Sequence, residues 1–226
     1  MIRLRLRPAS TEFMSLEGGD KLAALLRRSR SLEAEGNING ACEMRLEGVE
    51  ALLNAIGEED VRLNWDDRDS RAAMELLYLS AADHLSIGEV ETATTLWEQL
   101  LALDEEDHLE AVVMLALCYI MLEDWECLDD ALFNISTKSP EYHLINLWAE
   151  YRRSGGIDKD TLRTLRTRHK LWFEEFVATE HPADETYLAD CRSERPSQST
   201  EAREFWFATE AIWLNNNDFI TTIKKA

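Results

Sequence analysis

Five histidines and several clustered carboxylates are the side chains of this sequence that could bind a metal ion or act as acids and bases. Glu105 and His108 are spaced as Glu-x-x-His, which places both on one face of a helix, as in di-iron four-helix bundles. Such a site needs a second Glu-x-x-His step and two more carboxylates, and the sequence has no second step. We therefore expect a solvated acidic turn here.

The other chemical motifs also favour structural roles. Asp66 to Asp69 resembles the start of a calcium loop but lacks the central glycine and the terminal bidentate glutamate. Carboxylates placed at the N-terminus of a helix beginning near Ser70 explain this cluster better. His143, His169 and His181 have no Cys or acidic residue at ligand spacing. Glycine-rich phosphate loops and Gly-x-Ser-x-Gly elbows are also lacking, so we expect no catalytic residue, metal or cofactor.

Composition excludes several functional classes. The 226 residues carry 44 acidic and 24 basic side chains, a formal net charge of −20, whereas binding to nucleic acid or anionic membranes needs clustered Lys and Arg. Nine glycines and four prolines are too few for the turns of most all-β folds. The longest apolar run, residues 111–122, is shorter than the roughly 20 residues of a membrane-spanning helix. Widely spaced cysteines and an N-terminus unlike a signal peptide favour the cytoplasm.

Hydrophobic periodicity predicts helices nearly everywhere between residues 21 and 176. Apolar side chains recur at helical spacing, and the breaks between the periodic segments are short. The clearest stripes are residues 74, 77, 78, 81 and 85; 90, 93, 97 and 100; 109, 112, 113, 116 and 119; and 125, 128, 132 and 135. Because short connections force neighbouring helices to be antiparallel, we expect a series of helical hairpins.

A later hairpin has clear end signals. Ser139 is an N-cap candidate followed by Pro140, and Gly155 with Gly156 ends the helix. One further helix is expected through residues 162–176, and a short one at residues 184–191 within an irregular linker. A less regular hairpin is expected at residues 22–56.

Two of these hairpins resemble the tetratricopeptide repeat family, whose unit is 34 residues of paired antiparallel helices. The unit that begins at residue 109 matches the family pattern at Leu115, Ala116, Tyr119, Trp125 and Pro140. The preceding unit matches at Ala81, Gly88, Ala93 and Trp97. The resemblance implies an all-α fold, a right-handed α–α superhelix of antiparallel helical hairpins. The match is weaker on both sides of these two units.

The chain is accordingly divided into an N-terminal arm (1–19), a helical repeat domain (20–180), and a linker with aromatic-rich C-terminal capping helices (181–226). In the family, the first helix of each hairpin lines a concave groove that binds protein segments. The resemblance therefore implies groove residues at Glu75, Tyr78, Leu85, Glu110, Val113, Leu117, Ile120, Met121 and Asn146.

The expected function is non-enzymatic binding of a protein or peptide segment in this groove, as an adaptor or a chaperone. Residues 31–151 carry 28 acidic and 5 basic side chains, which favours a basic partner. This acidity is similar to that of bacterial secretion chaperones built on the same repeat. The alternative is the helical scaffold of an enzyme or regulator whose groove is occluded by its own C-terminal tail. The oligomeric state stays open.

Three smaller features have two interpretations each. The aromatic tail, residues 205–220, caps the solenoid or fills the groove. The alternating residues 2–7 form an edge strand for a partner or, more commonly, a frayed terminus. The basic residues 152–170, with Arg163, Arg166 and Lys170 on one helical face, pair with neighbouring carboxylates or contact a phosphate; we expect the pairing.

Overall fold

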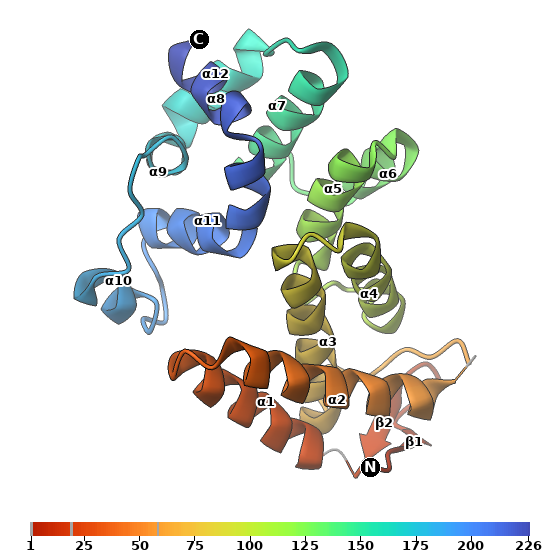
Figure 1. Cartoon of the computed structure of the whole chain (residues 1–226). Helices are drawn as coiled ribbons and strands as arrows, with labels where there is room; N and C mark the ends of the chain where they lie inside the picture. Colours follow the sequence, from red (N-terminus) through yellow and green to blue (C-terminus); the bar gives the residue numbers. More distant parts are fainter. Residues whose placement is uncertain (1, 19, 58) are drawn as a thin grey trace. The chain divides into compact units, whose positions relative to one another are not determined.

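The computed structural model describes residues 2–18, 20–57 and 59–226, and these are mostly helical (Figure 1). The chain divides into two compact units, Met1–Leu122 and Glu123–Ala226, which are treated separately below. This division falls inside the segment 20–180 that the sequence suggested as one repeat domain. Residues 1 and 19, the ends of the expected arm, lie outside the described residues. No helix in the described ranges is long and apolar enough to cross a membrane.

The described residues of the first unit form a short hairpin followed by five helices. Its elements are β1 (Arg5–Pro8), β2 (Met14–Glu17), α1 (Asp20–Ala34), α2 (Ile38–Ile56), α3 (Arg68–Ser86), α4 (Val90–Leu103) and α5 (Ala111–Leu122). Helices α1 and α2 pack against each other, α3 packs on both, α4 packs on α3, and α5 packs on α4. Sequential helices are thus neighbours, as the short connections predicted, and the expected mainly α-helical class is confirmed (Figure 1).

Residues 5–8 of the N-terminal segment form a strand, so the expectation of a frayed terminus is wrong for this part of it. β1 pairs antiparallel with β2 in the register Arg5↔Glu17 to Pro8↔Met14. β2 is held in turn by the chain before α3, because the Met14 N–H donates to the Arg62 carbonyl at 2.8 Å. The Leu16 side chain, 2% exposed, is buried by this arrangement. The part of the alternating segment that forms β1 therefore pairs with a strand of the same chain.

The acidic cluster before α3 forms its N-cap, as the sequence indicated. The Asp67 carboxylate accepts hydrogen bonds from the Ser70 N–H at 2.9 Å and the Ser70 hydroxyl at 2.8 Å. The Ser70 hydroxyl oxygen in turn accepts from the Leu16 N–H at 3.3 Å. One capping carboxylate therefore fixes the start of α3 and its contact with β2.

Replacing Asp67 with alanine should lower the free energy of unfolding by about 1–2 kcal/mol, because the cap and the orientation of Ser70 are both lost. Denaturant titration measures this change. Asp66→Ala is the matched control, since that exposed neighbour does not cap α3, and it should change the stability by less than about 0.5 kcal/mol. Equal losses in the two variants would contradict the capping role.

Close packing of α2 on α3 depends on a glycine. A Cβ atom added at Gly48 would lie 2.7 Å from Leu76 Cδ1, closer than side chains normally approach. Leu76 and Leu52, both 0% exposed, belong to the apolar core beside this position. The glycine lowers the helix propensity of α2 but lets the two helices approach closely.

The second unit contains seven helices among its described residues. They are α6 (Trp125–Asn134), α7 (Pro140–Ser154), α8 (Lys159–Arg168), α9 (Lys170–Phe176), α10 (Glu185–Asp190), α11 (Gln198–Asn215) and α12 (Asn217–Lys225). The predicted ends of α7 are confirmed. Ser139 accepts from the Tyr142 N–H at 3.2 Å, and Gly155 has the left-handed φ of 72° typical of a helix C-cap.

The single helix expected through residues 162–176 is instead two helices. His169, with φ −118° and ψ 44°, leaves the helical conformation and separates α8 from α9. The break changes the direction of the chain, so α9 packs against α11 while α8 packs against α7. Periodicity alone did not indicate this break, because both helices carry apolar residues at compatible spacing.

Aromatic side chains from the C-terminal helices complete the core of the second unit. Trp213 of α11 packs edge to face on Trp148 of α7 and on Phe176 of α9, with ring centroids 4.9 and 4.8 Å apart. Phe219 of α12 lies 5.5 Å from Tyr151 of α7. The aromatic segment 205–220 is therefore packed onto the last helices that precede it in the chain.

Candidate functional site

The residues predicted to line a groove divide by burial. Leu85, Leu117 and Ile120 are 2%, 0% and 0% exposed, so they do not line an open surface in the structure. The prediction that these three side chains contact a partner is corrected accordingly. Glu110 is exposed, while Glu75, Tyr78, Val113, Met121 and Asn146 are half-buried.

Two of these residues already have polar partners. The Glu75 carboxylate accepts from Arg30 Nη2 at 2.6 Å, which joins α3 to α1. Asn146 belongs to the second unit and donates to the Tyr142 carbonyl at 2.7 Å. Neither side chain is therefore a first choice for contact with a ligand.

Tyr78 and Glu110 do come together, in a group that we call the Tyr78 site: Tyr78, Trp97, Asp107, Glu110 and Val113. The Tyr78 ring of α3 packs edge to face on Trp97 of α4, with centroids 5.9 Å apart. Burial raises the pKa of Tyr78 to about 12, and the negative charges of Asp107 and Glu110 add to the shift. The phenol is thus protonated at neutral pH and lies in a negative field.

The loop between α4 and α5 supplies that field. The Asp107 carboxylate accepts from the Ala111 N–H at 2.6 Å and the Val112 N–H at 3.1 Å, and so caps α5. Asp107 and Glu110 have φ values of 50° and 54°, a left-handed conformation that costs about 1 kcal/mol or more per residue outside glycine.

The charge on this loop is not neutralised. Burial raises the pKa of Asp107, its two backbone hydrogen bonds lower it, and Asp104 and Glu110 raise it, with a net upward shift. In the described part of the chain, neither Asp107 nor Glu110 forms an ion pair. A cation beside Tyr78 would therefore meet two uncompensated carboxylates.

Glu105 and His108 have different partners in the structure. The Glu105 carboxylate pairs with Arg62, whereas His108 Nδ1 lies 2.7 Å from Asp104 Oδ1. The imidazole also stacks on Trp65, with centroids 4.6 Å apart and planes 4° from parallel. Over the described ranges, no three His, Cys, Asp or Glu side chains are grouped so that they could hold a metal ion.

A buried ionic group in the second unit, which we call the Glu175 cluster, consists of Glu175, His181 and Arg203. Glu175 is 8% exposed, and Arg203 donates to it twice, from Nε at 2.7 Å and from Nη2 at 2.8 Å. His181 Nδ1 lies 2.9 Å from Glu175 Oε1. Burial raises the pKa of Glu175, but the hydrogen bonds and charges of Arg203 and His181 outweigh it, so the pKa lies below its usual value.

The Glu175 cluster borders a cavity of about 610 Å³, which we call the aromatic pocket. Its lining residues come from the segment after α9, from α11 and from α12: Val177, Ala178, Thr179, Glu180, His181, Trp206, Phe207, Glu210, Trp213, Leu214, Asn217, Ile220, Thr221 and Lys224. The His181 ring stacks on Trp206, with centroids 4.0 Å apart and planes 18° from parallel. Trp206 is 7% exposed, and its Nε1 has no hydrogen-bond partner in the described residues.

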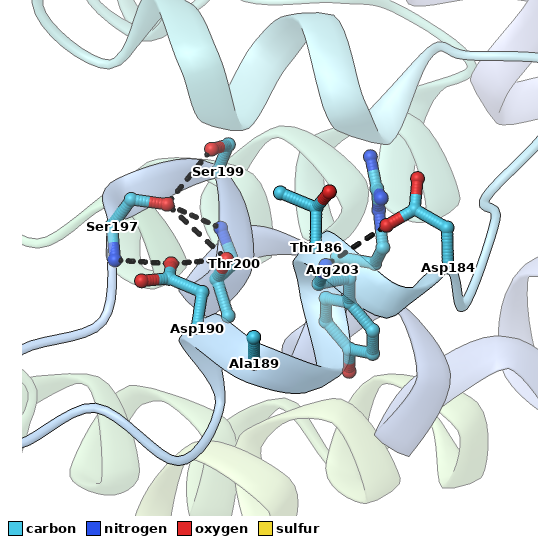
Figure 2. A pocket seen from close by; sticks show the side chains of 9 residues that line it. Asp184, Thr186, Ala189, Asp190, Ser197, Ser199, Thr200 and Arg203 are labelled. Carbon is cyan, nitrogen blue, oxygen red and sulfur yellow. Dashed lines mark hydrogen bonds between the residues drawn. The ribbon is translucent and has the colours of Figure 1, made fainter.

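Arg203 also lines a second cavity, most of whose lining residues have polar side chains (Figure 2). Asp190 accepts from the Thr200 hydroxyl at 2.6 Å and the Ser197 N–H at 2.8 Å, and these hydrogen bonds lower its pKa. Asp184 caps α10 by accepting from the Tyr187 N–H at 2.8 Å. The hydrogen bonds of Asp190 to Ser197 and Thr200 hold the end of α10 against the start of α11.

Four basic residues of α7 to α9 form ion pairs with carboxylates, as expected from the sequence. The ion pairs are Arg152–Glu123 at 3.1 Å, Arg153–Asp129 at 3.2 Å, Arg163–Asp160 at 2.9 Å and Lys170–Glu174 at 3.5 Å. Arg166 instead donates to the Ile223 carbonyl at 2.7 Å and thereby ties α8 to α12.

The Tyr78 site contains residues of the predicted groove. No spacing in the sequence indicates the Glu175 cluster, because its members come from three segments. Both sites are described from this chain alone, since comparisons with protein-family models, with curated proteins and with solved structures give no match.

Proposed function

We propose that this chain is a non-enzymatic protein-interaction module, an adaptor or chaperone, that binds a basic segment of a partner protein at the Tyr78 site. In this proposal the hairpins follow the tetratricopeptide superhelix and the protein works in the cytoplasm. The observation that carries it is the half-buried Tyr78 ring beside the unpaired carboxylates of Asp107 and Glu110.

The arginines of the acidic stretch do not neutralise these charges, because they have other partners. The basic side chains of the acidic stretch that lie in this unit are Arg45, Arg62, Arg68 and Arg71. The first three form ion pairs, and Arg71 donates to the Trp65 carbonyl and lies over the Trp65 ring. An external cation is therefore the natural counter-charge for the loop before α5.

A Lys or Arg side chain gains in two ways at the Tyr78 site. Contact with an aromatic ring contributes about 0.5–2 kcal/mol, depending on how far the cation is desolvated. The carboxylates add a Coulomb attraction that also speeds the approach of a basic partner. Half-buried Val113, in the first turn of α5, offers an apolar contact for the stem of the same side chain.

Binding of a fluorescent Lys- and Arg-rich peptide, measured by anisotropy, tests this function. Glu110→Gln and Tyr78→Leu should each weaken binding about three- to tenfold, because one removes a charge and the other the ring. Raising the salt from 0.05 to about 0.5 M should weaken wild-type binding further by screening.

The matched control is Glu91→Gln, which removes an exposed carboxylate from α4 outside the site. It should bind the peptide as the wild type does. Far-ultraviolet circular dichroism checks that all variants keep their helices. Wild-type affinity in both Glu110→Gln and Tyr78→Leu would exclude the Tyr78 site.

A further inference from the structure

The aromatic pocket of the second unit has the features of a separate binding site. Its base is apolar, because Trp206, Trp213 and Ile220 line it and are only 7%, 1% and 6% exposed. At its edge, Phe207 and Leu214 of α11 are 36% and 68% exposed. Large apolar side chains at the mouth of a cavity provide contact area for an apolar group that enters it.

Polar groups of the pocket are held in fixed positions. Arg203 holds Glu175 through two hydrogen bonds, and Glu175 holds the Nδ1 of His181. Because the carboxylate accepts, Nδ1 of His181 carries a proton. Trp206 Nε1, on the ring stacked against His181, is buried and has no hydrogen-bond partner in the described residues. These contacts fix the two rings that line the pocket.

Two carboxylates in the lining of the pocket favour a basic side chain in a bound segment. Glu180 and Glu210 are exposed, and neither forms an ion pair among the described residues. The one Lys of the lining, Lys224, donates to the Val177 carbonyl at 3.0 Å. The rim therefore lacks a cation close to its two carboxylates.

We propose that the aromatic pocket binds a partner's peptide segment in which a large apolar side chain lies next to a Lys or Arg. The apolar side chain enters among Trp206, Trp213 and Ile220, and the basic one contacts Glu180 and Glu210. This site shares no residue with the Tyr78 site and does not depend on the function proposed there.

The test uses the full chain and labelled hexapeptides containing a Lys-Leu-Lys core. Changing the central Leu of the peptide to Ala should weaken binding at least tenfold, since burial of that side chain is lost. The double variant Glu180→Gln/Glu210→Gln should weaken binding about three- to tenfold. Leu214→Asp, at a rim position exposed enough to tolerate it, should weaken binding to a similar extent.

Control variants separate this site from the rest of the protein. Glu185→Gln/Glu201→Gln removes two exposed carboxylates from α10 and α11 outside the pocket and should leave the affinity unchanged. The pocket variants change no residue of the Tyr78 site. Each proposal can therefore fail while the other holds.

Three results would overturn the proposal. Wild-type affinity in both the Glu180→Gln/Glu210→Gln and the Leu214→Asp variants places the peptide elsewhere. Equal binding of Lys-Leu-Lys and Glu-Leu-Glu peptides shows a merely apolar pocket. Finally, a dimer of the protein alone in sedimentation, lost in Leu214→Asp, assigns the pocket to a second copy of the chain.

Discussion

Replacing Glu175 with leucine is expected to lower the free energy of unfolding of the second unit by about 3–5 kcal/mol. The variant leaves the Arg203 guanidinium, whose side chain is 19% exposed, without either of its charged hydrogen bonds. It also leaves His181 Nδ1 without its acceptor. Urea denaturation followed by tryptophan fluorescence measures the loss, because Trp148, Trp172, Trp206 and Trp213 all belong to this unit.

The loss should also depend on pH. The pKa of Glu175 is lower in the folded protein than its usual value, so the carboxylate stabilises the fold above the unfolded pKa. That contribution disappears as the pH falls through the folded pKa. The difference between the wild type and Glu175→Leu should therefore be constant above about pH 5 and shrink on further acidification.

Glu174→Leu is the matched control for this experiment. Glu174 is the exposed neighbour of Glu175 and pairs with Lys170 at 3.5 Å on the surface. Surface ion pairs contribute little, so the control should lose less than about 1 kcal/mol and show no such pH dependence. A similar loss in both variants would mean that the buried cluster has no special stabilising role.

Helix ends were predictable from the sequence because their signals are local. Ser139 and Gly155 lie at the two ends of α7, and Asp67 caps α3 by accepting from the N–H three residues later in the chain. Such interactions need only the residue type and its spacing. The Glu175 cluster is different, because Arg203 is 28 residues from Glu175 and their contact depends on how α11 packs on α9. No spacing rule indicates that packing.

The groove prediction was wrong for Leu117 and Ile120, although the apolar composition of their helix already indicated that both are buried. Leu117 and Ile120 lie in α5, which is apolar on all sides from Ala111 to Leu122. A helix without a polar face is normally buried all round, and eight of its residues are buried here. The composition of this run therefore indicated core packing, whereas the family resemblance implied an open surface. Of the predicted groove residues, Tyr78 and Glu110 do lie close together in the structure, beside the charged loop residue Asp107.

Replacing Arg45 with leucine should be the most damaging charge removal in the first unit, at about 3–5 kcal/mol. Arg45 is 2% exposed and joins three helices, since Nη1 contacts Asp83 of α3 and Nη2 contacts Glu33 of α1, each at 2.6 Å. Without Arg45, the Asp83 carboxylate, whose side chain is only 19% exposed, loses its ion-pair partner. Hydrogen exchange of the α2 and α3 amides, followed by mass spectrometry, reports the loss locally.

The pKa shift of Asp83 has the opposite sign to that of Glu175. Burial raises the pKa of Asp83 more than Arg45 lowers it, so the folded pKa already lies above its usual value. A raised folded pKa means that the fold gains stability as the carboxyl takes up its proton and loses it as the pH rises. Arg45→Leu should therefore recover part of its stability as the pH falls from 7 and Asp83 takes up its proton.

A double-mutant cycle decides whether the Arg45–Asp83 pair itself is responsible. Arg45→Leu/Asp83→Leu removes the less exposed of the two carboxylates that Arg45 contacts and leaves only Glu33, whose side chain is 51% exposed, without its partner. The double variant should therefore be more stable than Arg45→Leu by at least about 1 kcal/mol. Arg28→Leu is the control, because that exposed side chain pairs with Glu35 only at 3.7 Å and should cost less than about 1 kcal/mol. The alternative outcome is that the loss in the double variant equals the sum of the losses in Arg45→Leu and Asp83→Leu. In that case Arg45 acts through the packing of its aliphatic stem, and its charge only completes the contact between α1, α2 and α3.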